Sequence, residues 1–248
     1  LWALQQAEGL DDESAIVALR HVYAPVRYWA VRLLCDDLGF AHKRTTQGLI
    51  ESLGESSEGR MRLSQKLLDA IVQRAQTEPN VEVRSQMAAS ARRLPVDQAF
   101  ALLKPLLRHG EDLDDPYVPL MCWWVIEANL DRGRDEVFAL LGEEEFRREP
   151  MVVKHILGRV MRALALKGKN RDLLDCEKLL EMVDSRTPLA QDQLDQDQLN
   201  QDQLDQVLQG FELAYAGRQV GALPNVLAQT LMKSGRTSLN LRIRLGES

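Results

Sequence analysis

The stretch Glu78-Pro79-Asn80-Val81-Glu82-Val83-Arg84 decides the predicted fold, because it places a proline just before an amphipathic helical pattern. Three more segments share this order: Ala24-Pro25-Val26-Arg27, Asp115-Pro116-Tyr117-Val118 and Glu149-Pro150-Met151-Val152. A proline is tolerated in the first turn of a helix, where the missing N–H has no intrahelical partner. Successive prolines are 54, 37 and 34 residues apart. The last two intervals are close to the period of roughly 40 residues that is typical of stacked helix pairs.

The first interval, 54 residues, is too long for a single helix pair. We therefore predict an inserted helix or loop between Ala41 and Arg60. Arg27 and Arg84 follow the first two prolines, and each is predicted to reach a carboxylate or a carbonyl of a neighbouring turn. The predicted structural signature of the repeat consists of these two arginines and the four prolines, Pro25, Pro79, Pro116 and Pro150.

Apolar residues at helical spacing cover most of the chain, whereas the alternation typical of strands is almost absent. A helix with such an apolar stripe buries one face against its neighbours. A helix pair cannot bury its stripe alone, so the stacking of pairs is the stable outcome. We predict an all-α fold, a right-handed α-solenoid of about 12 to 15 helices in HEAT-like pairs. A bundle of helices without true repeats is the alternative.

The 248 residues include 31 Lys and Arg against 37 Asp and Glu, a formal net charge of −6. Five of the aspartates lie between Gln191 and Gln206, so the rest of the chain carries 31 basic against 32 acidic residues. A nucleic-acid binder needs a basic stripe that displaces counterions from phosphates, and we therefore predict no nucleic-acid partner. No apolar run approaches the roughly 20 residues needed to cross a bilayer, so no transmembrane segment is predicted in this chain.

Residues 189–206 form a low-complexity insert rich in Gln and Asp, built on near-copies of the pentad QDQLD. Its leucines, Leu194, Leu199 and Leu204, are five residues apart and advance by about 140° per step, so they form no continuous seam on a helix. We predict that the insert is disordered at its start and joins a regular helix from about Leu204. The predicted domain is a single HEAT-like solenoid fragment over residues 1–248 that contains this insert.

Sequence motifs for metal, haem or nucleophilic chemistry are missing. No histidine has a second His or a Cys at helical spacing, whereas zinc needs about four converging ligands; the histidines are His21, His42, His109 and His155. Each cysteine lies within an apolar segment, where a buried, free thiol is expected: Cys35, Cys122 and Cys176. We therefore predict no catalytic, metal-binding or cofactor-binding residue in this chain.

The segment Asp114–Glu127 holds two of the four tryptophans, Trp123 and Trp124. Adjacent helical residues point about 100° apart, so at least one of the two packs between helices while the other can reach the surface. One hypothesis is a helical enzyme with a groove of aromatic walls and a carboxylate, formed by Trp123, Trp124, Glu127 and His155. The favoured alternative is that the tryptophans are core residues and that Glu127 pairs with an arginine of the next helix.

Five stretches resemble, in order, the HEAT-like region of large secreted proteins known as membrane-bound dehydrogenases of planctomycetes and their relatives. They are PVRYWAVRLLCD (25–36), DDPYVPLMCWWVIEA (114–128), PMVVKHILGRVM (150–161), DLLDCEKLL (172–180) and LQGFELAYAGRQVGALP (208–224). The stretch around Trp123 and Trp124 is the most specific, and the others are general helical sequence. The Gln/Asp-rich insert departs from the family pattern and leaves the helix count near residues 185–206 open.

In that family a β-propeller similar to sugar dehydrogenases precedes the helical region, and a c-type cytochrome domain follows it. The resemblance implies that this chain is a non-catalytic spacer between the two in a periplasmic or extracellular redox protein. Its partners would be other domains of the same polypeptide or further proteins, and any haem c would lie in the downstream domain. Because the chain starts at Leu1 within a helical pattern, we expect it to be a fragment of such a protein. A cytoplasmic HEAT-type adaptor is the alternative.

Overall fold

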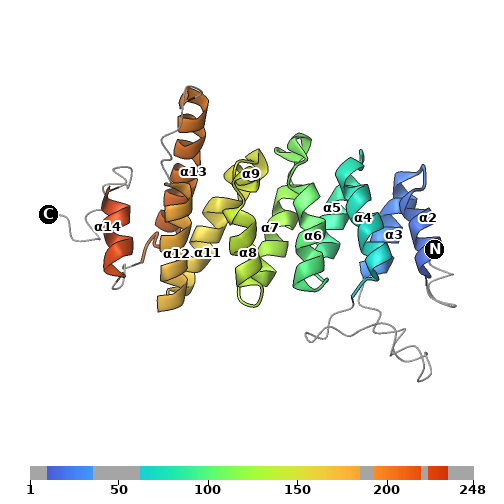
Figure 1. Cartoon of the computed structure of the whole chain (residues 1–248), viewed down its shortest axis with the longest axis horizontal. Helices are drawn as coiled ribbons and strands as arrows, with labels where there is room; N and C mark the ends of the chain where they lie inside the picture. The colour runs from blue at the N-terminus through green and yellow to red at the C-terminus, as the bar shows by residue number, and fades with distance from the viewer. Residues whose placement is uncertain (1–9, 36–61, 185–192, 219–222, 234–248) are drawn as a thin grey trace, which may run out of the picture. The chain divides into compact units, whose positions relative to one another are not determined.

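The computed structural model describes residues 10–35, 62–184, 193–218 and 223–233, and within these ranges it contains helices and no strands (Figure 1). This confirms the prediction of an all-α fold. The contacts divide the chain into two compact units, the first ending at Leu141 and the second beginning at Gly142. The inserted helix or loop predicted between Ala41 and Arg60 lies outside the described residues.

The helices of the first unit pack in two rows. They are α2 (Asp12–Leu19), α3 (Ala24–Cys35), α4 (Gln65–Thr77), α5 (Val81–Ala91), α6 (Val96–Leu106), the short 3₁₀ helix η2 (Gly110–Asp112), α7 (Val118–Asn129) and α8 (Arg134–Gly142). In one row α2 contacts α4 and α4 contacts α6, and in the other α3 contacts α5 and α5 contacts α7. Contacts of α2 with α3, of α5 with α6 and of α6 with α7 join the rows.

Polar side chains fix where these helices begin, because they accept hydrogen bonds from N–H groups of the first turn. The caps of α2, α4 and α5 are Asp11, Ser64 and Asn80, and Asp115, three residues ahead of α7, accepts from the N–H of Val118, the first residue of that helix. The start of α4 is also tied to α6: the side chain of Gln98 accepts from the Leu63 N–H at 2.9 Å and donates to the Leu63 carbonyl at 2.7 Å. Gln98 is buried, and this pair of bonds satisfies its amide.

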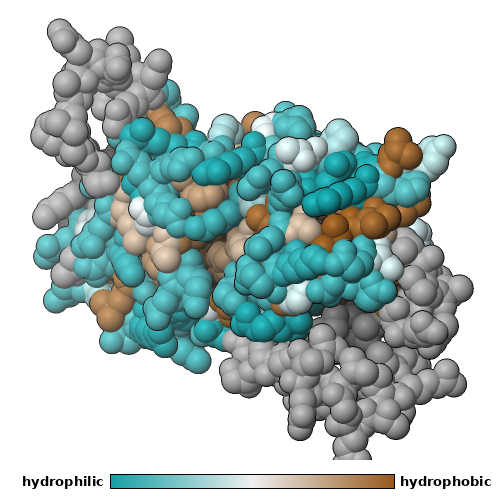
Figure 2. All heavy atoms as spheres, turned by 45° about the vertical axis from the view of Figure 1, so that its right-hand side comes forward, coloured by the Kyte–Doolittle hydropathy of each residue, from teal (hydrophilic) through white to brown (hydrophobic). Residues whose placement is uncertain are grey.

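Aliphatic side chains from both rows form the core of the first unit, and their spacing is the one that the sequence predicts. Fully buried examples are Leu19, Ile71, Met87, Leu103 and Ile126, one from each of five helices. Figure 2 shows the surface of the molecule from one side. It is mostly hydrophilic there and carries hydrophobic residues in small groups rather than in one broad patch. Burial of these stripes between helices supplies the main driving force for folding of the unit.

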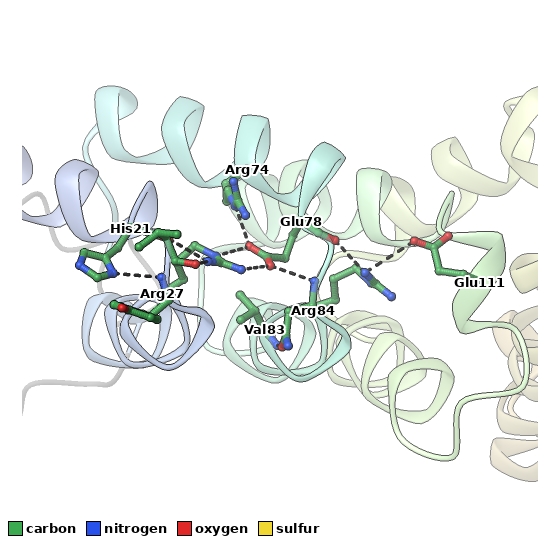
Figure 3. A network of polar contacts seen from close by, with 10 residues as sticks. His21, Arg27, Arg74, Glu78, Val83, Arg84 and Glu111 are labelled. Carbon is green, nitrogen blue, oxygen red and sulfur yellow. Dashed lines mark hydrogen bonds and ion pairs between the residues drawn. The ribbon is translucent and has the colours of Figure 1, made fainter.

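A buried ion pair joins α3 to the segment between α4 and α5 (Figure 3). Arg27, the fourth residue of α3, donates through Nε and Nη2 to the two carboxylate oxygens of Glu78 at 2.8 and 2.6 Å. Its Nη1 donates to the carbonyls of His21 and Val22 at 2.8 and 2.9 Å. Arg74, one turn earlier on α4, donates to the same carboxylate at 2.6 Å. Glu78 is completely buried, yet it is paired on both oxygens.

The same arrangement recurs one step along the row. Arg84, the fourth residue of α5, donates to the carbonyl of Glu78 at 2.7 Å, and this carbonyl lies six residues earlier, as that of His21 does for Arg27. Its Nε and Nη2 donate to the carboxylate of Asp112 at 2.6 and 2.5 Å. We call the residues Arg27, Arg74, Glu78, Arg84 and Asp112 the arginine network. The arginine network does not continue to α7, because the fourth residue of that helix is Met121, which carries no charge.

The arginine network keeps its central carboxylate charged in the core. Burial alone would raise the pKa of Glu78, but the hydrogen bonds from Arg27, Arg74 and the Asn80 N–H hold the pKa below its ordinary value of 4.5. The carboxylate therefore stabilises the folded state above about pH 4.5, and this contribution is lost as the pH falls through the lowered pKa. Removal of one member of a buried ion pair leaves its partner charged and unsatisfied, which typically costs about 3–5 kcal/mol.

We predict that Glu78→Ala lowers the free energy of unfolding of the first unit by about 3–5 kcal/mol, because Arg27 loses its carboxylate within the core. Urea unfolding followed by tryptophan fluorescence measures this unit selectively, since all four tryptophans precede Gly142. The control is Lys66→Ala, which removes only the exposed ion pair with Glu13 and should cost about 1 kcal/mol or less. Equal losses in the two variants would contradict the prediction.

The second unit is built around one close helix contact. Its helices are α9 (Glu144–Arg147), α10 (Pro150–Val152), the π-helical turn η3 (Val153–Leu157), α11 (Gly158–Lys167), α12 (Asn170–Val183), α13 (Gln193–Ala214) and α14 (Asn225–Lys233). Helix α11 packs against α12 and α13, and α14 packs against α12. A Cβ atom at Gly210 of α13 would lie 2.1 Å from the carbonyl oxygen of Gly158, so the two backbones touch where both residues are glycine.

The prediction that the Gln/Asp-rich insert becomes helical only from about Leu204 is wrong, because α13 begins at Gln193. Gln and Leu are good helix formers, and the amide of Gln198 donates to Asp202, four residues later, at 2.9 Å. Leu204 is buried beside Gln203, whereas Leu199 is half-buried. The start of the insert, residues 189–192, lies outside the described residues.

We predict that Gly210→Ala destabilises the second unit. The added methyl group meets backbone that no side-chain rotation can clear, so the helices must separate, and the loss exceeds the gain of about 1 kcal/mol in helix propensity. Far-UV circular dichroism should then show an early thermal transition, while the tryptophan transition of the first unit stays in place. Gly142→Ala is the control, because a Cβ there meets nothing within 4 Å. An unchanged dichroism melt for Gly210→Ala would refute the prediction.

Candidate interaction surface

The outward side of the α3–α5–α7 row carries a pocket of about 400 Å³. We call it the Tyr28 pocket; its lining residues are Tyr28, Val81, Glu82, Ser85, Asp115 and Tyr117. A smaller hollow of about 130 Å³ adjoins it, sharing Tyr28 and Glu82, and is lined further by residues that include Pro25, Trp29 and Val83. The two hollows lie at the N-terminal ends of α3, α5 and α7, so three successive helices of one row contribute to one surface.

Exposed aromatic rings form the walls of this surface. Tyr117 is 63% exposed and Trp29 is 37% exposed, although both are large side chains. The rings of Tyr28 and Trp29 pack edge to face with centroids 6.0 Å apart, and the guanidinium of Arg32 lies 5.2 Å from the Trp29 centroid. Aromatic side chains with one apolar face in water are enriched where proteins bind one another.

The Tyr28 pocket is acidic. Its six lining residues include two carboxylates, Glu82 and Asp115, and no Lys or Arg. Asp115 accepts hydrogen bonds through Oδ1 from the N–H groups of Tyr117 and Val118, both at 2.8 Å, which fixes the orientation of its carboxylate. Glu82 is exposed on the first turn of α5 and makes no side-chain hydrogen bond or ion pair within the described part of the chain.

The arginine network holds the rim of the Tyr28 pocket in place. Glu78 accepts a hydrogen bond from the Asn80 N–H at 3.0 Å, and Asn80 in turn caps α5 through the Val83 N–H at 3.1 Å. Val81 and Glu82, which line the pocket, lie between these two contacts along the chain. The pocket is therefore positioned by buried ion pairs and a helix cap, which favours a surface that is formed before any partner binds.

The residues of the predicted repeat signature lie where helices begin. Pro25 is the second residue of α3, Pro79 and Pro116 stand two residues before α5 and α7, and Pro150 is the first residue of α10. Arg27 and Arg84 each contact both a carboxylate and a carbonyl, the two kinds of group expected from the sequence.

The residues of the predicted groove fall in both units. In the first, Trp123 is 8% exposed and belongs to the core, whereas Trp124, at 36%, and Glu127 face outward on α7. His155 is half-buried in η3 of the second unit. Because each unit is described by itself, a groove that combines all four residues stays a prediction. The predicted pair between Glu127 and an arginine is wrong for the described residues, where Glu127 makes no ion pair and the nearby Arg132 donates to Asn129 at 3.0 Å instead.

The cysteines are free and buried, which confirms that part of the sequence analysis. Burial raises the pKa of Cys35 and of Cys122 to about 12, and it also raises the pKa of Cys176. A nucleophilic cysteine needs a stabilised thiolate, and these environments favour the thiol. We therefore assign the three cysteines to packing.

Within the described residues, no three His, Cys, Asp or Glu side chains come together in a way that could hold a metal ion. In the same ranges, no helix combines the length and the apolar character needed to span a membrane.

None of the residues that line the Tyr28 pocket is among the site residues predicted from the sequence, although several of them lie within the proline-headed segments: Val81, Glu82, Asp115 and Tyr117. The available signal was the position of Tyr28 and Tyr117 close behind two of the repeated prolines, Pro25 and Pro116. Comparison of the chain with protein-family models, with curated proteins and with solved structures finds no match. The assignment of function must therefore start from the surface itself.

We predict that the two neighbouring tryptophans differ sharply in their effect on stability. Trp123→Ala removes a core side chain and should lower the free energy of unfolding by about 3–5 kcal/mol. Trp124→Ala, on the outward face, should lower it by about 1 kcal/mol or less. Urea unfolding followed by circular dichroism and by the remaining tryptophans compares them directly. A large loss for Trp124→Ala would mean that this side chain is also packed.

Proposed function

We propose that this chain is a non-catalytic helical-repeat scaffold that binds protein segments on the outward side of its α3–α5–α7 row. The observation that carries the proposal is the Tyr28 pocket, with exposed aromatic walls on a frame fixed by the arginine network. Interfaces between proteins gain most of their binding energy from a few such aromatic anchors. Because the frame is already ordered, little conformational entropy would be lost on binding.

The proposal includes a right-handed α-solenoid of HEAT-like helix pairs. Two lines of helices that alternate along the chain, α2–α4–α6 and α3–α5–α7, are what a stack of helix pairs requires. The recurrence of the arginine environment supports a true repeat over a plain bundle: Arg27 and Arg84 are each the fourth residue of their helix and each bind a carbonyl six residues earlier.

For the biological setting we retain the spacer of a larger secreted redox protein, with the resemblance around Trp123 and Trp124 as its support. In that setting the partner segment would come from another domain of the same polypeptide, and a haem c would belong to the downstream domain. The alternative, a cytoplasmic adaptor, would use the same surface for a separate protein. Both settings make the α3–α5–α7 surface the functional part of the described chain.

We predict that phage display of random 16-residue peptides on the folded chain enriches sequences that bind this surface. Purified peptides should lose about tenfold or more in affinity on Tyr117→Ala or Trp29→Ala, because each variant removes an exposed aromatic anchor. The control is Leu174→Ala, which removes an exposed apolar side chain of the second unit and should leave the affinity unchanged. Fluorescence anisotropy with labelled peptides provides the measurement.

Two results would count against this function. One is the absence of any enriched peptide, and the other is a set of peptides whose affinity falls on Leu174→Ala but not on the two aromatic variants. Circular dichroism of each variant ensures that the affinities compare folded proteins.

A further inference from the structure

We propose that the Tyr28 pocket binds the guanidinium group of an arginine side chain in an extended partner segment. The inference rests on the proposed function and specifies the chemistry that the surface recognises. It is carried by the charge, the aromatic walls and the dimensions of the pocket.

The charge of the pocket fits a cation. Two of its six lining residues are carboxylates and none is basic, and Glu82 has no cationic partner within the described part of the chain. The N-termini of α3, α5 and α7 oppose this field, but each helix end carries only about half an elementary positive charge. The two full charges of Glu82 and Asp115 exceed the sum of these partial charges, so the lining of the pocket keeps a net negative charge.

The aromatic walls favour arginine over lysine. Tyr28 and Tyr117 both line the pocket, and a planar guanidinium can stack on such a ring while its N–H groups reach a carboxylate. The chain already contains one such pairing at this surface, between Arg32 and Trp29. The ammonium of lysine is a compact, strongly hydrated charge and cannot make the two contacts in one plane.

The dimensions favour a side chain of a larger partner over a free small molecule. Sites that hold small ligands bury most of the ligand surface, whereas the Tyr28 pocket is an open hollow of about 400 Å³ on a helix row. The adjoining hollow, with Pro25, Trp29 and Val83 in its lining, offers an apolar place next to the acidic one. The matching segment would therefore carry an arginine with an apolar residue close to it.

The first test uses Nα-acetyl-arginine amide and Nα-acetyl-citrulline amide, which differ in charge but hardly in shape. Each is titrated into the ¹⁵N-labelled full chain up to about 50 mM, well above the millimolar range in which single contacts are measurable. We expect saturable shifts of the Glu82, Ser85 and Tyr117 amide signals with the arginine amide, and at least fivefold weaker binding of the citrulline amide. Equal binding of the two, shifts confined to other residues or no saturable binding would overturn the proposal.

The second test uses the variant Glu82→Gln, which keeps the shape of the side chain and removes its charge. It should weaken binding of the arginine amide about threefold or more, whereas the matched control Glu136→Gln, an exposed glutamate of α8, should not change it. Loss of affinity in both variants alike would point to general attraction by an acidic chain and would overturn the assignment of the pocket.

The peptides selected on the chain separate this inference from the proposed function. Replacement of their arginines by citrulline should weaken binding about tenfold. If such peptides depend on Tyr117 but not on any arginine, the scaffold function stands and the arginine pocket is refuted. Sedimentation of the chain alone tests whether a second copy of the chain occupies the pocket. A dimer that Tyr117→Ala abolishes would mean that it does, and this too would refute the proposal.

Discussion

A buried guanidinium must have its N–H groups satisfied by fixed acceptors, and this requirement organises the first unit. Arg27 and Arg84 together donate hydrogen bonds to two carboxylates and three backbone carbonyls, and Arg84 also forms an ion pair with Glu111 at 3.6 Å. Glu78 accepts from both arginines, from one with its side chain and from the other with its carbonyl. Such contacts need α3, the end of α4, α5 and η2 to lie in one particular arrangement. Hydrophobic stripes alone tolerate small slips between helices, whereas bidentate ion pairs do not.

The buried ion pairs of the core also fix the position of the Tyr28 pocket on the surface. Asn80, Val81 and Glu82 lie two to four residues after Glu78 in the chain, and Asp115 follows Asp112 by three residues. Residues that line the Tyr28 pocket are thus only a few bonds from residues whose positions are fixed by buried charges. A surface built in this way can keep aromatic rings in water without collapse onto the core.

Several features could be predicted from the sequence because they depend on local pattern. The helical spacing of apolar residues predicted the helices. The matching positions of Arg27 and Arg84 after a proline predicted that the two arginines have similar roles. The partners Glu78 and Asp112 could not be predicted, since Arg27 and Glu78 are 51 residues apart and meet only when two rows form. The pocket could not be predicted either, because it brings together Tyr28 of α3 and Tyr117 at the N-cap of α7, two places further along the row. The early start of α13 was missed because its leucines form no continuous apolar face. Helix propensity depends on residue type and does not require such a face.

The pentads of α13 have a consequence for how this chain can vary. One more QDQLD unit ahead of Gln198 would extend the helix by about 7.5 Å and turn everything before it by about 140°, while the packed part from Gln203 to Ala214 would keep its register. The length of this helix can therefore change by whole pentads while the contact between Gly210 and Gly158 stays in place.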